Sequence, residues 1–234
     1  MEREVRTKER WVVRGDGDAS NSHTVSSGTV EIPAIYPVNA GSVGFLANAN
    51  WVLQDESGER LEGSLSKAER VNLAPLKVHA TSVDGTETVL YAFNEVSLLR
   101  QSMQSAHLRI CVNNTTRLSN LVADGVLLAT SAGSSAYNYS AGGPVLPLKA
   151  QLLALTPLSP FRPRRWKGAV LPQSSQVTMH VLDHSKRPVL AAADFVELRD
   201  VTHLHVAEDP SMSVPLMFDP KKTLEDRIFR EMFE

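Results

Sequence analysis

The chain has 234 residues, which suits one large domain or two small ones with a buried core. Its formal net charge of -2 and its 42% of hydrophobic residues are ordinary for a globular protein, so we expect neither nucleic acid nor an anionic membrane as a partner. The one cysteine, Cys111, excludes an internal disulfide, and no apolar run approaches the roughly 20 residues that span a bilayer. The charged N-terminus shows no signal peptide, which favours a cytoplasmic protein.

The first 35 residues are the least regular, and residues 16–29 show no helical period. Residues 35–38 predict a short strand before a Gly-rich turn. Residues 66–72 predict one or two helical turns with Ser66 as the N-cap. The far end of the chain predicts a helix that begins at Thr223, with apolar residues four apart on one face.

Short strand signals repeat between these ends and are separated by turn residues. They cover residues 76–81, 88–93, 107–112, 125–129, 177–182, 195–198, 203–207 and 214–218. Residues 148–155 fit a short helix or a strand, ended by the prolines that follow. Many short strands with turns between them predict a sheet-rich body, most simply a β-sandwich.

A loop of small residues, 130–144, follows the apolar strand signal at 126–129. Small side chains let the backbone approach a ligand closely, and exposed N–H groups and hydroxyls can bond phosphate or ribose oxygens. Asp124, just before the strand, can accept bonds from cationic or N–H groups of a base. A Ser/Gly-rich turn without a ligand would have the same composition.

Residues 124–144 resemble the motif DGxxxxTPTGSTAYxxSAGGP of NAD kinases. Three further segments resemble motifs of that family and occur in the family's order. Residues 14–18 resemble GGDGT, residues 38–46 resemble NxGxxGFL, and Asn94 with Glu95 resembles the NE motif. A lipid kinase would share the GGDG-type turn but lacks the TPTGSTAY-like segment. Four motifs in order make the resemblance specific.

The resemblance implies a fold of two parts. The first is an N-terminal α/β, Rossmann-like domain with the GGDGT-like turn, expected at residues 1–91 and joined by a returning segment at 215–234. The second is a β-sandwich domain that binds NAD, expected at residues 92–214. Since the family has a strand and a helix before GGDGT and only eleven residues precede Val12, the N-terminal domain is expected to be truncated.

The resemblance also implies an activity. An NAD kinase transfers a phosphoryl group from ATP or polyphosphate to the 2'-hydroxyl of the NAD adenosine ribose, with Mg²⁺ or another divalent cation, and forms a homodimer or homotetramer. Asp16 would be the catalytic base, and Asp16 and Gly17 would lie against the substrates. An Asp-Gly turn is a common alternative. Because Arg14 and Asp18 depart from the motif, an NAD(P)-binding module with impaired catalysis is the other reading.

Several more residues are expected to bind NAD because they match the family's motifs. They are Phe45, Asn94, Glu95, Asp124, Ala132, Ser135, Ala136, Tyr137 and Ser140. Tyr137 can stack on a base and keep its hydroxyl in water. Phe45 could equally be a core residue, and Asn94 with Glu95 a polar strand edge. The histidines show no zinc-site spacing, so no residue is expected to ligate a metal.

Overall fold

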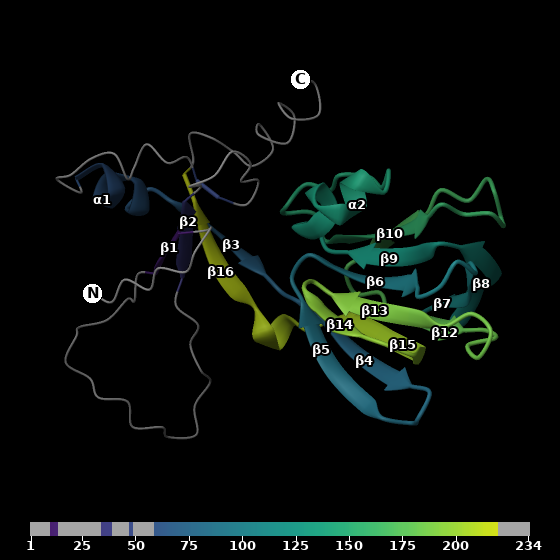
Figure 1. Cartoon of the computed structure of the whole chain (residues 1–234). Helices are drawn as coiled ribbons and strands as arrows, with labels where there is room; N and C mark the ends of the chain where they lie inside the picture. The colour runs from purple at the N-terminus through teal and green to yellow at the C-terminus, as the bar shows by residue number, and fades with distance from the viewer. Residues whose placement is uncertain (1–9, 14–33, 39–46, 49–58, 220–234) are drawn as a thin grey trace. The chain divides into compact units, whose positions relative to one another are not determined.

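The computed structural model describes residues 10–13, 34–38, 47–48 and 59–219 (Figure 1). The chain divides into two compact units. One comprises Met1–Leu73 with Ser213–Glu234, and the other comprises Ala74–Met212. The expected C-terminal helix and residues 16–29 lie outside the described residues.

The described residues of the first unit form a four-stranded sheet and a helix, α1 (Glu59–Leu65). Its strand order is β1-β2-β16-β3, with bounds Arg10–Val13, Ile35–Val38, Val214–Phe218 and Glu69–Leu73. Strand β16 pairs parallel with β2 and antiparallel with β3, so the last described strand lies inside the sheet of the first unit. Tyr36 and Val38 are buried and pack against Leu61, Leu65 and Met217, as an α/β unit requires.

The helical turn predicted at residues 66–72 is wrong. Helix α1 ends at Leu65, and Ser66 donates from Oγ to the carbonyl of Gly63 at 3.0 Å, so it lies at a helix end rather than at a start. Strand β3 follows, and Val71 pairs with Leu216 of β16. Pairing with a strand far along the chain therefore overrides the local capping pattern.

The second unit consists of two six-stranded sheets. The first has the order β11-β10-β9-β6-β13-β14, with bounds Ala169–Pro172, Leu152–Leu158, Gly125–Ala129, Glu95–Arg100, Val189–Ala193 and Val196–Leu198. The second has the order β5-β4-β15-β12-β7-β8, with bounds Glu87–Ala92, Leu76–Ser82, Val201–Glu208, Val177–Val181, Ala106–Val112 and Thr115–Ala123.

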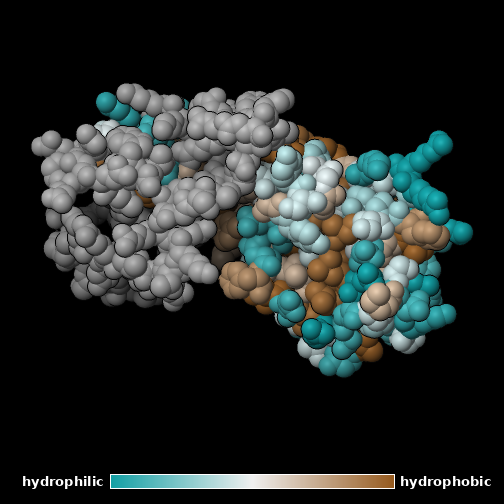
Figure 2. All heavy atoms as spheres, turned by 45° about the horizontal axis from the view of Figure 1, so that its top comes forward, coloured by the Kyte–Doolittle hydropathy of each residue, from teal (hydrophilic) through white to brown (hydrophobic). Residues whose placement is uncertain are grey.

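Side chains from both sheets form one core. Leu98 of β6 and Leu128 of β9 belong to the same buried cluster as Leu108 of β7, Met179 of β12 and Leu204 of β15. Buried and less buried residues alternate along β12 and β13, as expected for strands with one face on a core. The predicted β-sandwich is therefore confirmed. Figure 2 shows hydrophobic residues reaching the surface of this unit between hydrophilic ones.

Strand β9 is buried on both faces. Val126 and Leu128 join the sandwich core, whereas Leu127 and Ala129 pack with Leu146 in a second cluster on the other side. This explains why residues 125–129 form an uninterrupted apolar run rather than an alternating one. The segment that covers the second face begins with a 3-10 turn, η2 (Gly133–Ser135), and a short helix, α2 (Tyr137–Ser140).

Two expected boundaries differ from the structure. The β-rich unit begins at Ala74, well before residue 92, because β4 pairs with β15 across more than half of the chain. Residues 148–155 contribute a strand rather than a helix, and β10 continues through Pro157 to Leu158. Pro157 lies beyond the part of β10 that pairs with β11, so its missing N–H removes no bond on that side.

Candidate functional site

Two candidate segments meet at one end of β9. Glu95, the first residue of β6, pairs with Ala129, the last residue of β9. The next residue, Thr130, donates from its backbone N to the carbonyl of Asn94 at 2.9 Å and from Oγ1 to the carbonyl of Phe93 at 2.7 Å. The NE pair and the small-residue loop, which are distant in the sequence, are thus held together by hydrogen bonds.

Gly133 allows the close approach of these two segments. Its backbone N donates to Thr130 Oγ1 at 3.0 Å. A Cβ atom at this position would lie 2.1 Å from the carbonyl oxygen of Asn94, which is far inside van der Waals contact. The sequence needs glycine here because backbone packs directly against backbone.

The loop is fixed from behind by two buried polar side chains. Ser134 donates from Oγ to the carbonyl of Ser131 at 2.7 Å and accepts from the N of Leu146 at 2.9 Å. Asn138 donates from Nδ2 to the carbonyls of Ser134 at 3.0 Å and Pro144 at 2.9 Å, while its Oδ1 accepts from Thr156 at 2.6 Å. These partners occupy the inward side of the loop and make it rigid.

The other loop candidates differ in exposure. Ala136, Tyr137 and Ser140 are exposed, and Ser135 is half-buried. Ala132 is buried, with 4% of its surface exposed, so its side chain supports the loop from within. Tyr137 and Ser140 lie on α2, and Ala136 immediately precedes it. This short helix follows Thr130, whose backbone N is hydrogen-bonded to the carbonyl of Asn94. A ligand with one aromatic and several polar groups fits this chemistry.

Glu95 carries an unmatched polar atom at this place. Its Oε2 is buried and has no hydrogen-bond partner among the described residues. Burial raises the pKa of its carboxyl from 4.5 to about 7, and the negative charge of Asp194 acts in the same direction. A hydrogen bond from the backbone of Tyr137 acts in the opposite direction. A carboxyl of this kind can take a donor from a ligand or carry a proton near neutral pH.

Asp194 belongs to the site and was not predicted from the sequence. It occupies the turn between β13 and β14 at a φ of 50°. Its carboxylate accepts hydrogen bonds from the backbone N–H groups of Phe93 at 2.7 Å, Asn94 at 2.9 Å and Glu95 at 3.2 Å. The sequence signals this turn only by an aspartate between two strand patterns. Aspartate suits the turn because it tolerates a positive φ.

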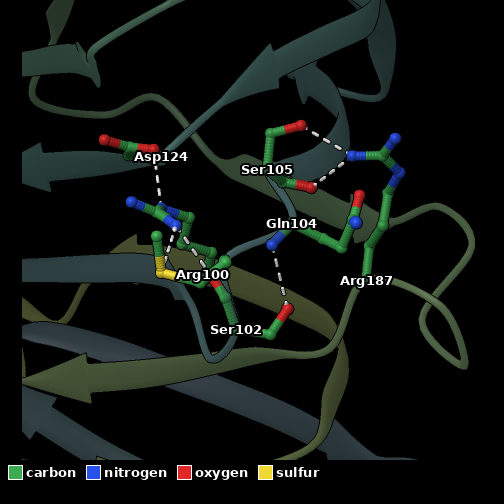
Figure 3. A network of polar contacts seen from close by, with 7 residues as sticks. Arg100, Ser102, Gln104, Ser105, Asp124 and Arg187 are labelled. Atoms are coloured by element: carbon green, nitrogen blue, oxygen red, sulfur yellow. Dashed lines mark hydrogen bonds and ion pairs between the residues drawn. The ribbon is translucent and has the colours of Figure 1, made fainter.

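Asp124 lies at the opposite end of β9. It precedes Gly125, which pairs with Leu99, whereas Glu95 pairs with Ala129. At about 3.3 Å per residue, Asp124 and Glu95 are roughly 17 Å apart along the strand. Asp124 instead forms an ion pair with Arg100, whose Nε lies 2.7 Å from Oδ1 (Figure 3). Within one chain, Asp124 is not brought together with Glu95 or the small-residue loop, which are the other candidates among the described residues.

Three candidates, Asp16, Gly17 and Phe45, lie outside the described residues. Within the described ranges, no group of three or more His, Cys, Asp or Glu side chains could hold a metal ion. No helix in the same ranges is long and apolar enough to cross a membrane.

Comparison with known proteins places the chain in a family. Residues 93–203 match the family model of the ATP-NAD kinase C-terminal domain. An NAD kinase from Caulobacter vibrioides is 44% identical over 222 residues, which are 95% of this chain and 83% of that protein. An NAD kinase from Xanthomonas campestris is 47% identical over 199 residues, which are 85% of this chain and 76% of that protein.

Solved structures share the fold. Yeast NADH kinase complexed with NADH aligns with a TM-score of 0.69 at 25% identity, over 82% of this chain and 55% of the yeast chain. An NAD kinase from Archaeoglobus fulgidus in complex with ATP aligns with a TM-score of 0.68 at 21% identity, over 83% of this chain and 72% of that chain. With relatives above 40% identity over most of its length, the chain belongs to the NAD kinase family.

Proposed function

We propose that this chain is an NAD kinase, which transfers a phosphoryl group from ATP, or from polyphosphate, to the 2'-hydroxyl of the NAD adenosine ribose and forms NADP. The observation that carries the proposal is the junction at the end of β9, where Thr130 is bonded to Phe93 and Asn94 beside the exposed face of α2. Relatives named NAD kinase match the chain across this junction.

The proposed dinucleotide site uses the exposed part of the loop. Tyr137 is 41% exposed and can stack on the adenine, while Ser135 and Ser140 offer hydroxyls. Glu95 offers a buried oxygen, Oε2, that has no hydrogen-bond partner in the part of the chain that the structure describes. An unsatisfied buried polar group costs about 1–3 kcal/mol of folding free energy. A ligand that donates a hydrogen bond to this oxygen would remove that cost, which favours binding.

The proposed chemical step depends on Asp16. A carboxylate near the acceptor hydroxyl can take its proton, while Gly17 lets the backbone lie close to phosphate groups. Mg²⁺ would neutralise charge on the donor phosphates. Because the described residues hold no carboxylate cluster, we propose that the nucleotide phosphates supply most of the ion's ligands.

We propose a homodimer or homotetramer in the cytoplasm. The supporting geometry is the separation of about 17 Å between Asp124 and Glu95 along β9. If Asp124 contacts the same dinucleotide as Asn94, a second copy of the chain is the simplest way to bring it there. The free cysteine Cys111 is compatible with a reducing compartment.

The experiment that tests the function measures binding and turnover separately. Purified chain is incubated with NAD, ATP and Mg²⁺, NADP is detected with a coupled dehydrogenase, and NAD affinity is measured by calorimetry. We expect NADP formation, and we expect Asp16→Asn to reduce it by about 10²–10⁴-fold while NAD binding is retained. Binding without turnover would favour the impaired NAD(P)-binding module, which Arg14 and Asp18 suggest. Absence of both would contradict the proposal.

A further inference from the structure

Three successive backbone N–H groups converge on one side chain at the start of β6. Oδ2 of Asp194 accepts from Phe93 at 2.7 Å, and Oδ1 accepts from Asn94 at 2.9 Å and from Glu95 at 3.2 Å. In return, the backbone N of Asp194 donates to the carbonyl of Glu95 at 3.1 Å. A turn about 100 residues along the chain therefore sets the backbone of the NE pair.

This arrangement is more specific than an ordinary turn. Charge-assisted hydrogen bonds from backbone N–H groups to a carboxylate are about twice as strong as neutral ones. The carbonyls of the same segment are also engaged, because Phe93 and Asn94 accept from Thr130 Oγ1 at 2.7 and 3.3 Å. Asp194 thus holds one side of residues 93–95, and the small-residue loop holds the other.

We propose that Asp194 is a positioning residue of the dinucleotide site, which fixes Asn94 and Glu95 against the loop that carries Tyr137. This inference rests on the proposed function, and it adds a residue that the family motifs in the sequence did not include. Asp194 acts through the backbone that it binds and does not itself need to contact NAD.

The charge of Asp194 has a second consequence. The groups that act on the Glu95 carboxyl are the Asp194 carboxylate and the backbone of Tyr137, in addition to burial, and the pKa of Glu95 is about 7. None of the ion pairs formed by the described residues includes either carboxylate. Removing the charge at Asp194 should therefore lower the pKa of Glu95 and move the pH dependence of NAD binding to lower pH.

Asp200 provides a matched control. It also occupies a turn at positive φ, at 55°, and it follows β14 as Asp194 precedes it. Its polar partner is the side chain of Gln101, which donates to Oδ1 at 3.2 Å, and not the backbone of residues 93–95. Substitution of Asp200 therefore changes a similar turn without touching the NE pair.

The test compares Asp194→Ala, Asp194→Asn and Asp200→Asn in the full chain. Amide hydrogen exchange of Phe93, Asn94 and Glu95 is measured without ligand, and KM for NAD and ATP and the pH profile of NAD affinity are measured with substrates. For Asp194→Ala we expect about tenfold faster exchange and about a tenfold higher KM for NAD, with little change in KM for ATP. For Asp194→Asn we expect a lower pH midpoint, and for Asp200→Asn wild-type values.

The outcomes separate this inference from the proposed function. Suppose that the wild type binds NAD and that Asp194→Asn binds it with the same affinity and the same pH profile. This result would overturn the role of Asp194 and leave the proposed function intact. A wild-type chain that binds no NAD would overturn both. If Asp194→Ala does not fold, Asp194→Asn decides, because Asn keeps an acceptor oxygen and tolerates a positive φ.

Discussion

The Nε atom of Arg100 lies 2.7 Å from Oδ1 of Asp124, so the carboxylate that the motif assigns to NAD already has a cation beside it (Figure 3). The backbone N of Arg100 also donates to the carbonyl of Asp124 at 2.9 Å. This pair lies at the end of β9 away from Asn94 and the loop, and both side chains are partly exposed. Such a pair contributes little to stability, so a ligand held by the second copy that we propose could compete for Asp124 at little cost.

The separation of Asp124 from Asn94 predicts complementation between copies. Asp124→Ala and Asn94→Ala should each raise the KM for NAD by about tenfold to a hundredfold and should change the KM for ATP less. If the two residues act on one dinucleotide from different copies, mixed oligomers contain some sites with neither defect. We therefore expect a refolded mixture of the two variants to exceed the activity of either alone. Activity of the mixture equal to the mean of the separate variants would rule out a shared site.

Gly133→Ala should damage both the stability and the site. The added Cβ would lie 2.1 Å from the carbonyl oxygen of Asn94, and backbone on both sides leaves no flexible group to move. Overpacking of this kind costs about 1–3 kcal/mol, and the NE pair would be displaced from the loop. Thermal unfolding and NAD calorimetry measure the two effects. Gly63→Ala is the control, because nothing lies within 4 Å of its added Cβ and α1 accepts alanine readily.

The sandwich was predictable where local pattern and burial agree. Strand β12 alternates buried and half-buried residues, and β9 is apolar on both faces, so each gives a signal readable from its own residues. The outcome differs at β3, where Val71 pairs with Leu216, because no local window contains both strands. The start of the β-rich unit was missed for the same reason, since β4 pairs with β15.

The site was predictable only in part. Residues 94–95 and 130–140 carry recognisable motifs, and the structure joins them through Thr130. Asp194 has no motif, and its importance arises from three hydrogen bonds to residues about 100 positions earlier. The distance from Asp124 to the loop depends on the direction of β9, which a linear motif does not display.

The double substitution Arg14→Gly with Asp18→Thr should raise turnover with little change in NAD affinity. Both changes restore the GGDGT pattern, which the family places at the phosphates, whereas the proposed NAD contacts in residues 94–140 are untouched. Catalysis needs reacting groups held within about 0.5 Å of productive geometry, and binding tolerates more slack. The comparison requires kcat from the coupled assay and Kd from calorimetry. A kcat unchanged by the substitution would mean that Arg14 and Asp18 are accommodated.

Glu95→Gln should stabilise the protein at high pH and have no such effect at low pH. The pKa of Glu95 is raised from 4.5 to about 7 by burial and by Asp194, so the folded state binds more protons than the unfolded state between these values. The contribution of Glu95 to stability is therefore fully present below pH 4.5 and is lost as the pH rises through 7. Glutamine resembles the protonated carboxyl at every pH, so the variant keeps at high pH the stability that the wild type loses there.

The size of this effect follows from the partial burial of Glu95. Solvent screening reduces the full electrostatic cost, so we expect about 1 kcal/mol, or roughly 2–4 °C in Tm, in favour of Glu95→Gln at pH 8. Burial lowers the pKa values of His180 and His203, so the protein loses stability as the pH falls below 6.5. This loss is the same in the wild type and in Glu95→Gln, so it cancels in the difference between their Tm values. The matched control is Glu197→Gln, at an exposed position in β14, which should leave Tm unchanged both at pH 8 and below pH 4.5. Equal Tm values for wild type and Glu95→Gln at pH 8 would show that Glu95 is ionised there without cost.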